Sequence, residues 1–174
     1  TKVSSYKYEF HLSKECSQYF NSKLELYRSD SRNMQLTTTD TPYTHMNFLA
    51  IDVYYENDIA YVAGIVFNDW LDSGRPNYKT KVVGVEKYTP GEFYRRELPC
   101  ILKLIEEHKL KPDCIIIDGY VFLENNTSGL GKYLYDALNG MVPVIGVAKN
   151  PRGEMPEKMK VYRGESKKPL FITS

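Results

Sequence analysis

The sequence predicts an α/β protein with a mixed β-sheet and helices on the faces of that sheet. Residues 46–88 contain three consecutive β-rich segments, NFLAIDVYY, DIAYVAGIVF and TKVVGVEKY. The first two are separated by a short polar turn over residues 56–58, which predicts a hairpin, and the third follows a loop over 69–78. Residues 92–148 then alternate between helical patterns and short apolar strands, which is typical of a parallel sheet.

The first 45 residues are polar and are predicted to form an N-terminal helix and a linker. Ser13 is a suitable N-cap for a helix over 13–27, where apolar residues recur at spacings of three and four. Residues 29–45 are rich in Ser, Thr and Asp, which predicts a loop or linker. A compact domain is therefore expected over residues 46–174.

The remaining elements follow from apolar runs and their boundaries. A helix is expected over 92–108, after the turn Thr89-Pro90-Gly91, because its apolar residues fall mostly on one face. The later elements are a strand over 114–118, a helix over 130–138, a strand over 143–148 and a short strand over 169–173. The ribonuclease-H-like fold has this order of elements, which it shares with several other α/β folds.

Composition excludes several protein classes. The 174 residues include 42% hydrophobic and 26% charged residues, which argues against a disordered, collagen-like or coiled-coil chain. The three cysteines form no CxxC pair, so neither a structural zinc site nor a disulfide framework is indicated. No apolar run approaches the roughly 18 residues that a membrane helix needs. We expect a cytoplasmic protein, or a nuclear one in a eukaryote, without a membrane association.

The distribution of charge leaves nucleic acid open as a partner. The chain has 23 Lys+Arg and 22 Asp+Glu, a net charge of +1, whereas nucleic-acid binders often carry a basic excess. Residues 149–168, however, contain seven basic and three acidic side chains. A local positive excess of this kind is what a phosphate backbone attracts.

Three acidic residues are candidates for a metal site. Asp52 interrupts the apolar first strand, Asp118 ends the central strand CIIID, and Glu97 lies in the helix after the third strand. Carboxylates at the ends of adjacent strands suit Mg²⁺ or Mn²⁺, which prefer oxygen ligands. The structural alternatives stay open at this point: a turn former for Asp118, a solvated strand position for Asp52 and a solvated helix position for Glu97.

Several segments together resemble the endonuclease V family, in the family's order and at nearly its spacing. They are AIDVYY (50–55), YTPGEFYRRELPCIL (88–102), PDCIIIDGY (112–120), GLGKYL (129–134), VPVIGVAKN (142–150) and KPLFITS (168–174). The resemblance implies a ribonuclease-H-like fold and Mg²⁺-dependent cleavage of nucleic acid near inosine or deoxyinosine. The family cuts the second phosphodiester on the 3′ side of the deaminated base. DNA repair and RNA turnover use the same chemistry, and both stay open.

The resemblance also implies roles for individual residues. Asp52, Glu97 and Asp118 match the family's metal-binding catalytic acids, and Lys149 matches the lysine near the scissile phosphate. The residues matched to binding of the base or strand are Tyr88, Thr89, Pro90, Gly91, Phe93, Gly119 and Gly129. The expected cofactor is Mg²⁺, with Mn²⁺ as a substitute, and the expected partner of this monomer is DNA or RNA containing deaminated adenine.

The sequence also departs from the family pattern. After Asp118-Gly119 the family usually has His-Gly and then His-Pro-Arg, whereas this chain has YVFLENN over 120–126. Tyr133 occupies the place of a family histidine, and the chain ends at Ser174, before the position of a further His or Asp. These departures sustain a second hypothesis, a nucleic-acid-binding module of the same fold with little or no catalysis. A plain protein-interaction domain is a third, which leaves the acids on apolar strands unexplained.

Overall fold

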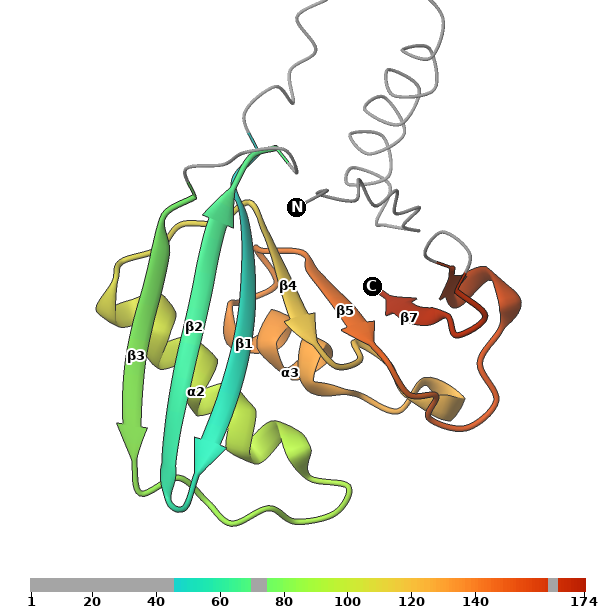
Figure 1. The fold of residues 1–174 in the computed structure, drawn as a ribbon, viewed down its shortest axis with the longest axis horizontal. Helices are drawn as coiled ribbons and strands as arrows, with labels where there is room; N and C mark the ends of the chain where they lie inside the picture. Colours follow the sequence, from blue (N-terminus) through green and yellow to red (C-terminus); the bar gives the residue numbers. More distant parts are fainter. Residues whose placement is uncertain (1–45, 70–74, 163–165) are drawn as a thin grey trace, which may run out of the picture.

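The computed structural model describes residues 46–69, 75–162 and 166–174. The described strands form one mixed sheet in the order β3-β2-β1-β4-β5-β7-β6 (Figure 1). This arrangement confirms the predicted α/β architecture. The helix predicted over 13–27 and the linker predicted over 29–45 lie outside the described residues.

The first two strands form the predicted hairpin. β1 (Phe48–Glu56) and β2 (Ile59–Phe67) pair antiparallel along their whole length. Buried and exposed residues alternate along much of both strands, because one face packs on the core and the other faces solvent. Asn57 adopts a left-handed φ of 57° in the connecting turn, a conformation that asparagine tolerates well.

The third strand lies earlier in the chain than predicted. β3 (Asn77–Val83) pairs antiparallel with β2, from Ile65 opposite Asn77 to Ile59 opposite Val83. The prediction of a strand over 80–88, after a loop over 69–78, is therefore wrong at both ends. Gly84 has a φ of +75° and ends the strand, so residues 85–88 belong to the connection that leads to the first described helix.

The alternating half of the chain follows the prediction closely. α2 (Phe93–Glu107), β4 (Cys114–Asp118), α3 (Leu130–Ala137), β5 (Val144–Ala148) and β7 (Leu170–Thr173) each match an expected element. β4 is parallel to both β1 and β5, and β7 closes antiparallel on β5. Three short elements were not predicted: η1 (Glu124–Asn126), η2 (Glu157–Met159) and β6 (Lys160–Val161).

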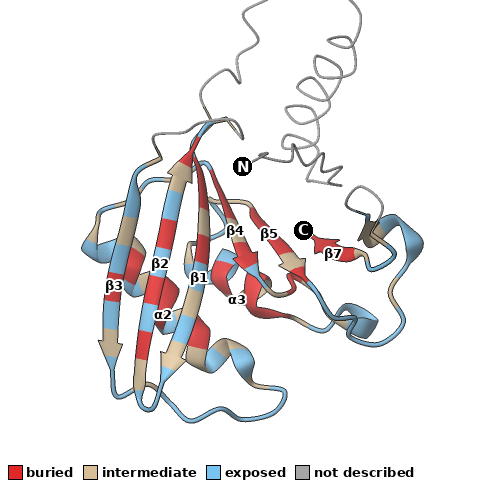
Figure 2. Ribbon diagram, in the orientation of Figure 1, coloured by how far each residue is buried: buried red, intermediate tan, exposed pale blue. Residues whose placement is uncertain are grey.

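The main apolar cluster lies between the sheet and the described helices α2 and α3. α2 and α3 pack behind the sheet in the view of Figure 1, and their apolar residues join those of β1, β2 and β4 in one cluster. Figure 2 shows buried positions on the central strands and on the helix surfaces that face them. Among the described residues, no helix has the length and apolar character needed to cross a membrane.

The sheet opens between β1 and β4, and this opening positions the site described below. The two strands pair from Phe48 opposite Cys114 to Ile51 opposite Ile117. β1 then continues to Glu56 along β2, whereas β4 ends at Asp118. The strands therefore separate directly after the buried Ile51 and Ile117, within a sheet that is otherwise continuous.

Candidate active site

Asp52 and Asp118 lie side by side at the opening between β1 and β4. Each is the first residue after the last position at which β1 and β4 pair with each other, Ile51 opposite Ile117. Because successive residues of a strand point to opposite faces, both aspartates turn away from the helix-covered face on which Ile51 and Ile117 are buried. The Asp52 carboxylate also accepts a hydrogen bond from the backbone N–H of Val53, at 3.0 Å. Register thus brings together two acids that lie 66 positions apart in the chain.

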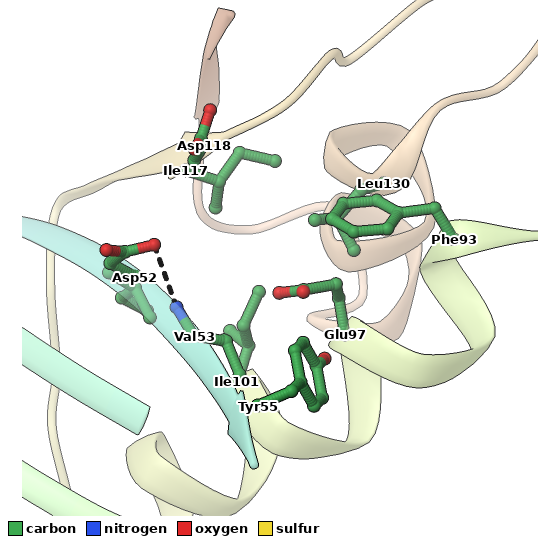
Figure 3. Close-up of a pocket in the computed structure, with 10 residues that line it drawn as sticks. Asp52, Val53, Tyr55, Phe93, Glu97, Ile101, Ile117, Asp118 and Leu130 are labelled. Atoms are coloured by element: carbon green, nitrogen blue, oxygen red, sulfur yellow. Dashed lines mark hydrogen bonds between the residues drawn. The ribbon is translucent and has the colours of Figure 1, made fainter. Parts of the chain in front are cut away.

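Glu97 reaches the same place from the helix side. It lies in the second turn of α2, is only 6% exposed, and lines a cavity of about 170 Å³ together with Asp52 and Asp118. Figure 3 shows the carboxyl group pointing from α2 toward the space between the two strands. The interpretation of Glu97 as a solvated helix residue is therefore wrong. Its spacing of four from Phe93 and from Ile101, which both line the cavity, was the signal for its inward position.

The environment of Glu97 disfavours its charged form. Burial is the main cause, the negative charges of Asp52 and Asp118 add to it, and together they raise the pKa of Glu97 to about 7. The Arg96 guanidinium and the Tyr55 hydroxyl oppose this rise. The Tyr55 hydroxyl acts from beside the carboxylate rather than through a well-formed hydrogen bond, because this buried oxygen has no partner at standard geometry in the described part of the chain.

Tyr55 is a lining residue that the sequence analysis did not single out. It follows Ile51 and Val53 on the helix-facing side of β1, and all three line the cavity. The Arg96 guanidinium carbon lies 3.5 Å from the centre of the Tyr55 ring, which holds that ring against α2. Strand alternation could have placed Tyr55 on this face, but local sequence gives no reason to connect it with Glu97.

Lys149 is close to Asp118 at the end of the next strand. Asp118 pairs with Val147 on β5, and Lys149 follows two positions later, just after that strand ends. Burial raises the pKa of Asp118, the positive charge of Lys149 opposes the rise, and the charge of Asp52 adds to it. The predicted phosphate-contacting lysine therefore lies at the same end of the central strands as the predicted metal-binding aspartates.

The donor set at the cavity suits a hard divalent cation. Asp52, Glu97 and Asp118 offer only carboxylate oxygens. Burial is the main cause of the raised pKa of Glu97, and a bound cation would relieve the repulsion by Asp52 and Asp118 that adds to it. In residues 46–69, 75–162 and 166–174, no three His, Cys, Asp or Glu side chains gather tightly enough to enclose a metal ion. Magnesium does not need such a cage, because it is commonly held by one or two carboxylates and retains several waters. The residues present thus fit this type of ion.

The predicted base- and strand-binding residues fall into two groups. Tyr88, Thr89, Pro90 and Gly91 form an exposed connection between β3 and α2, with the Tyr88 side chain 51% exposed. The backbone N–H of Glu92 donates to the Thr89 carbonyl at 3.0 Å, and Gly91 has a φ of +85°, so this connection is a tight turn. Its position beside Phe93 places it at the rim of the cavity.

The second group surrounds the cavity or supports its wall. Phe93 lines the cavity and is 37% exposed. A Cβ on Gly119 would lie 4.0 Å from the Phe93 ring, whereas one on Gly129 would lie 2.4 Å from the Tyr120 carbonyl oxygen. Gly129 therefore permits close backbone packing and does not line the cavity. Its predicted contact with the base or strand stays a prediction.

The sequence that departs from the family pattern forms a small closed turn. The Leu123 N–H donates to the Thr127 carbonyl at 2.7 Å, and Phe122 pairs with Ser128 across the turn. Asn125 and Asn126 both adopt a φ of 57° at its tip. Tyr133 stacks on Tyr94 of α2, with ring centres 3.8 Å apart, so this replacement joins the two helices.

Comparison with known sequences identifies one family. Residues 31–172 match the family model for endonuclease V. The endonuclease V of Sulfolobus acidocaldarius is 28% identical over 131 residues, which span 75% of this chain and 62% of that protein. The endonuclease V of Saccharolobus solfataricus is 31% identical over 101 residues, or 58% of this chain and 48% of that protein. The chain thus spans between about half and three-fifths of the length of these relatives.

Solved structures agree on the fold. An endonuclease V from Streptomyces avermitilis superposes with a TM-score of 0.59 at 23% identity, covering 94% of this chain and 77% of that one. Endonuclease V from Ciona intestinalis, solved with DNA containing an inosine followed by a ribo-adenosine, gives a TM-score of 0.60 at 17% identity, over 92% of this chain and 83% of that one. At these identities the likeness concerns the fold.

Proposed function

The chain belongs to the endonuclease V family, and we propose that it is a metal-dependent endonuclease that cleaves nucleic acid near inosine or deoxyinosine. The observation that carries this proposal is the grouping of Asp52, Glu97 and Asp118 around one cavity, within the residues that match the family. Three carboxylates at one cavity destabilise the fold unless a bound ligand neutralises their charge. Their grouping therefore favours a catalytic explanation over a structural one.

Each acid has a distinct part in the proposed site. Asp52 and Asp118 would hold Mg²⁺ or Mn²⁺ at the opening between β1 and β4, and the bound ion would activate water and stabilise the leaving oxygen of the phosphodiester. Glu97 faces them from α2, where its carboxylate can act as a further ligand or accept a proton from the attacking water. The pKa of Glu97 is raised to about 7 in the metal-free protein, and a bound cation would lower it, so that the carboxylate is ionised and can accept a proton at neutral pH.

The remaining predicted residues would bind and orient the strand. The Lys149 ammonium lies near Asp118, where it can bind the scissile phosphate and keep the phosphodiester beside the acids. The exposed Tyr88 can stack where a base has left the helix, and the cavity between Phe93 and Glu97 lies next to that tyrosine's turn. We propose DNA or RNA with deaminated adenine as the partner, and a monomeric cytoplasmic protein.

The direct test is cleavage of labelled oligonucleotides. Inosine-containing RNA and deoxyinosine-containing DNA are incubated with the protein and Mg²⁺, and the same reactions are run with EDTA. We expect a cut on the 3′ side of the deaminated base that depends on the metal, and no cut in matched adenine controls. Metal-independent cutting, or no cutting of either inosine substrate, would overturn the proposal.

A second candidate function is a binding module with little or no catalysis. It is favoured by the altered segment 120–126, which follows directly after Asp118 and Gly119. The two functions separate in one experiment, because a binding module would retain the inosine-containing strand in a mobility-shift assay with Mg²⁺ and leave it uncut.

A further inference from the structure

Tyr120 connects the segment after β4 to the loop after β5. Its ring is buried, at 6% exposure, and packs with Ala148 and Phe171 in a small apolar cluster. Its hydroxyl donates a hydrogen bond to the backbone carbonyl of Asn150 at 2.6 Å. A rigid, buried aromatic side chain thus ends in a polar contact with the residue directly after Lys149.

The loop that receives this hydrogen bond carries Lys149, whose positive charge acts on Asp118. Lys149 begins an irregular segment that runs to Pro156, after β5 ends at Ala148. β5 itself fixes the start of the loop, because Val147 pairs with Asp118 and its carbonyl accepts the Gly119 N–H at 3.0 Å. Beyond Ala148 the position of the Lys149 backbone depends on contacts outside that pairing.

The same segment after β4 makes a second contact with this loop. The Glu124 side chain lies directly over Gly153, where an added Cβ would come within 2.1 Å of a carboxylate oxygen. Gly153 also has a φ of +69°, so the loop turns sharply beneath Glu124. Residues 120–124 therefore contact the loop at both its beginning and its middle.

We infer that Tyr120 is a positioning residue: its hydroxyl holds the loop after β5 so that the Lys149 ammonium stays beside Asp118. The inference rests on the proposed function for the role of Lys149 toward phosphate, whereas the tie between Tyr120 and the loop is a property of the fold. The buried ring supplies the fixed support, and the hydrogen bond transmits it to the loop backbone.

The first experiment measures the loop itself. Tyr120→Phe removes the hydroxyl and keeps the packed ring, and Tyr135→Phe on α3 is the control, since the Tyr135 hydroxyl lies beside Gly140, just after the end of that helix. Hydrogen exchange is followed by mass spectrometry on peptides covering residues 149–156. We expect exchange in that peptide to be about fivefold faster in Tyr120→Phe, the factor that corresponds to one ordinary hydrogen bond, and unchanged in the control. Equal exchange in all three proteins would overturn the inference.

The second experiment asks whether Tyr120 acts through Lys149. Cleavage of an inosine-containing oligonucleotide with Mg²⁺ is measured for Tyr120→Phe, Lys149→Ala and the double variant. We expect kcat/KM to fall about fivefold on Tyr120→Phe in the native background and less than twofold in the Lys149→Ala background. An equal loss in both backgrounds would overturn the inference, because Tyr120 would then act on another part of the site.

The hydrogen-exchange and cleavage experiments test the role of Tyr120 and the proposed endonuclease function separately. A native protein that neither cuts nor binds the oligonucleotide would refute the proposed endonuclease. Hydrogen exchange would still decide whether the Tyr120 hydroxyl holds the loop, because that measurement needs no substrate and no metal. Thermal melting of both tyrosine variants checks that the ring still packs, and faster exchange confined to residues 149–156 identifies a local effect.

Discussion

Replacing Glu97 with glutamine is expected to stabilise the metal-free protein at alkaline pH. Glu97 is 6% exposed, and burial together with Asp52 and Asp118 raises its pKa from 4.5 to about 7. The folded protein therefore binds this proton more tightly than the unfolded chain does. Stability from the protonated form is complete below pH 4.5 and is lost as the pH rises through about 7. At about 1.4 kcal/mol per pKa unit, the full loss is about 3 kcal/mol.

Glutamine carries no charge at any pH, so the variant escapes this loss. Urea unfolding in EDTA is measured at pH 5 and pH 8 for the native protein and Glu97→Gln. The variant should be more stable by less than about 1 kcal/mol at pH 5 and by about 3 kcal/mol at pH 8. Glu106→Gln, an exposed position on the same helix, is the control and should show no pH-dependent difference. A Glu97→Gln protein no more stable than the native one at pH 8 would refute the reasoning, as would an equal difference at both pH values.

Three further predictions concern the site and the loop beside it. Asp52→Asn and Asp118→Asn should each lower Mg²⁺-dependent cleavage by about a thousandfold with little change in melting temperature, and a variant that cleaves at the native rate would remove its acid from the mechanism. Lys149→Ala should reduce the slope of log binding constant against log salt for an oligonucleotide by about 1, as expected for one lost phosphate contact; an unchanged slope would show that Lys149 does not touch the backbone. Gly153→Ala should destabilise the fold by about 1 kcal/mol in urea unfolding, because the φ of +69° strains alanine, whereas the exposed Glu124 carboxylate can move aside from the new methyl group. Native stability in that variant would mean that the loop shifts without cost.

Much of the fold could be predicted because its signals are local. The alternation in β1 and β2 and the wholly apolar runs of β4 and β5 each depend on which face of a strand is buried. The prediction placed β3 too late in the chain, because the start of this strand is set by its pairing with β2, where Asn77 lies opposite Ile65. The polar residues at that start give no local indication of a strand. Backbone pairing with a neighbouring strand overrode local propensity there.

The site was only partly visible in the sequence for a related reason. Asp52 and Asp118 could be proposed from their strands, but their adjacency follows from a register in which Ile51 faces Ile117. No local pattern encodes that register. Glu97 could be read from helical spacing, whereas its contact with Tyr55 and its raised pKa need the packing of α2 on β1.

The opening between β1 and β4 explains why these acids can coexist with a stable core. Had β1 and β4 continued to pair, Asp52 and Asp118 would be adjacent ladder positions and Glu97 would be sealed beneath them. Because the strands separate after Ile51 and Ile117, the aspartates remain exposed and only Glu97 is buried. The electrostatic cost therefore falls mainly on one carboxyl, which can take a proton when no cation is present. A cation that neutralises the three carboxylates would let Glu97 ionise. Metal binding should therefore release a proton below pH 7 and little above it. Calorimetric titration of Mg²⁺ at pH 6 and pH 8 in buffers of different ionisation enthalpy measures that release directly. Equal proton release at both pH values would show that Glu97 does not respond to the metal.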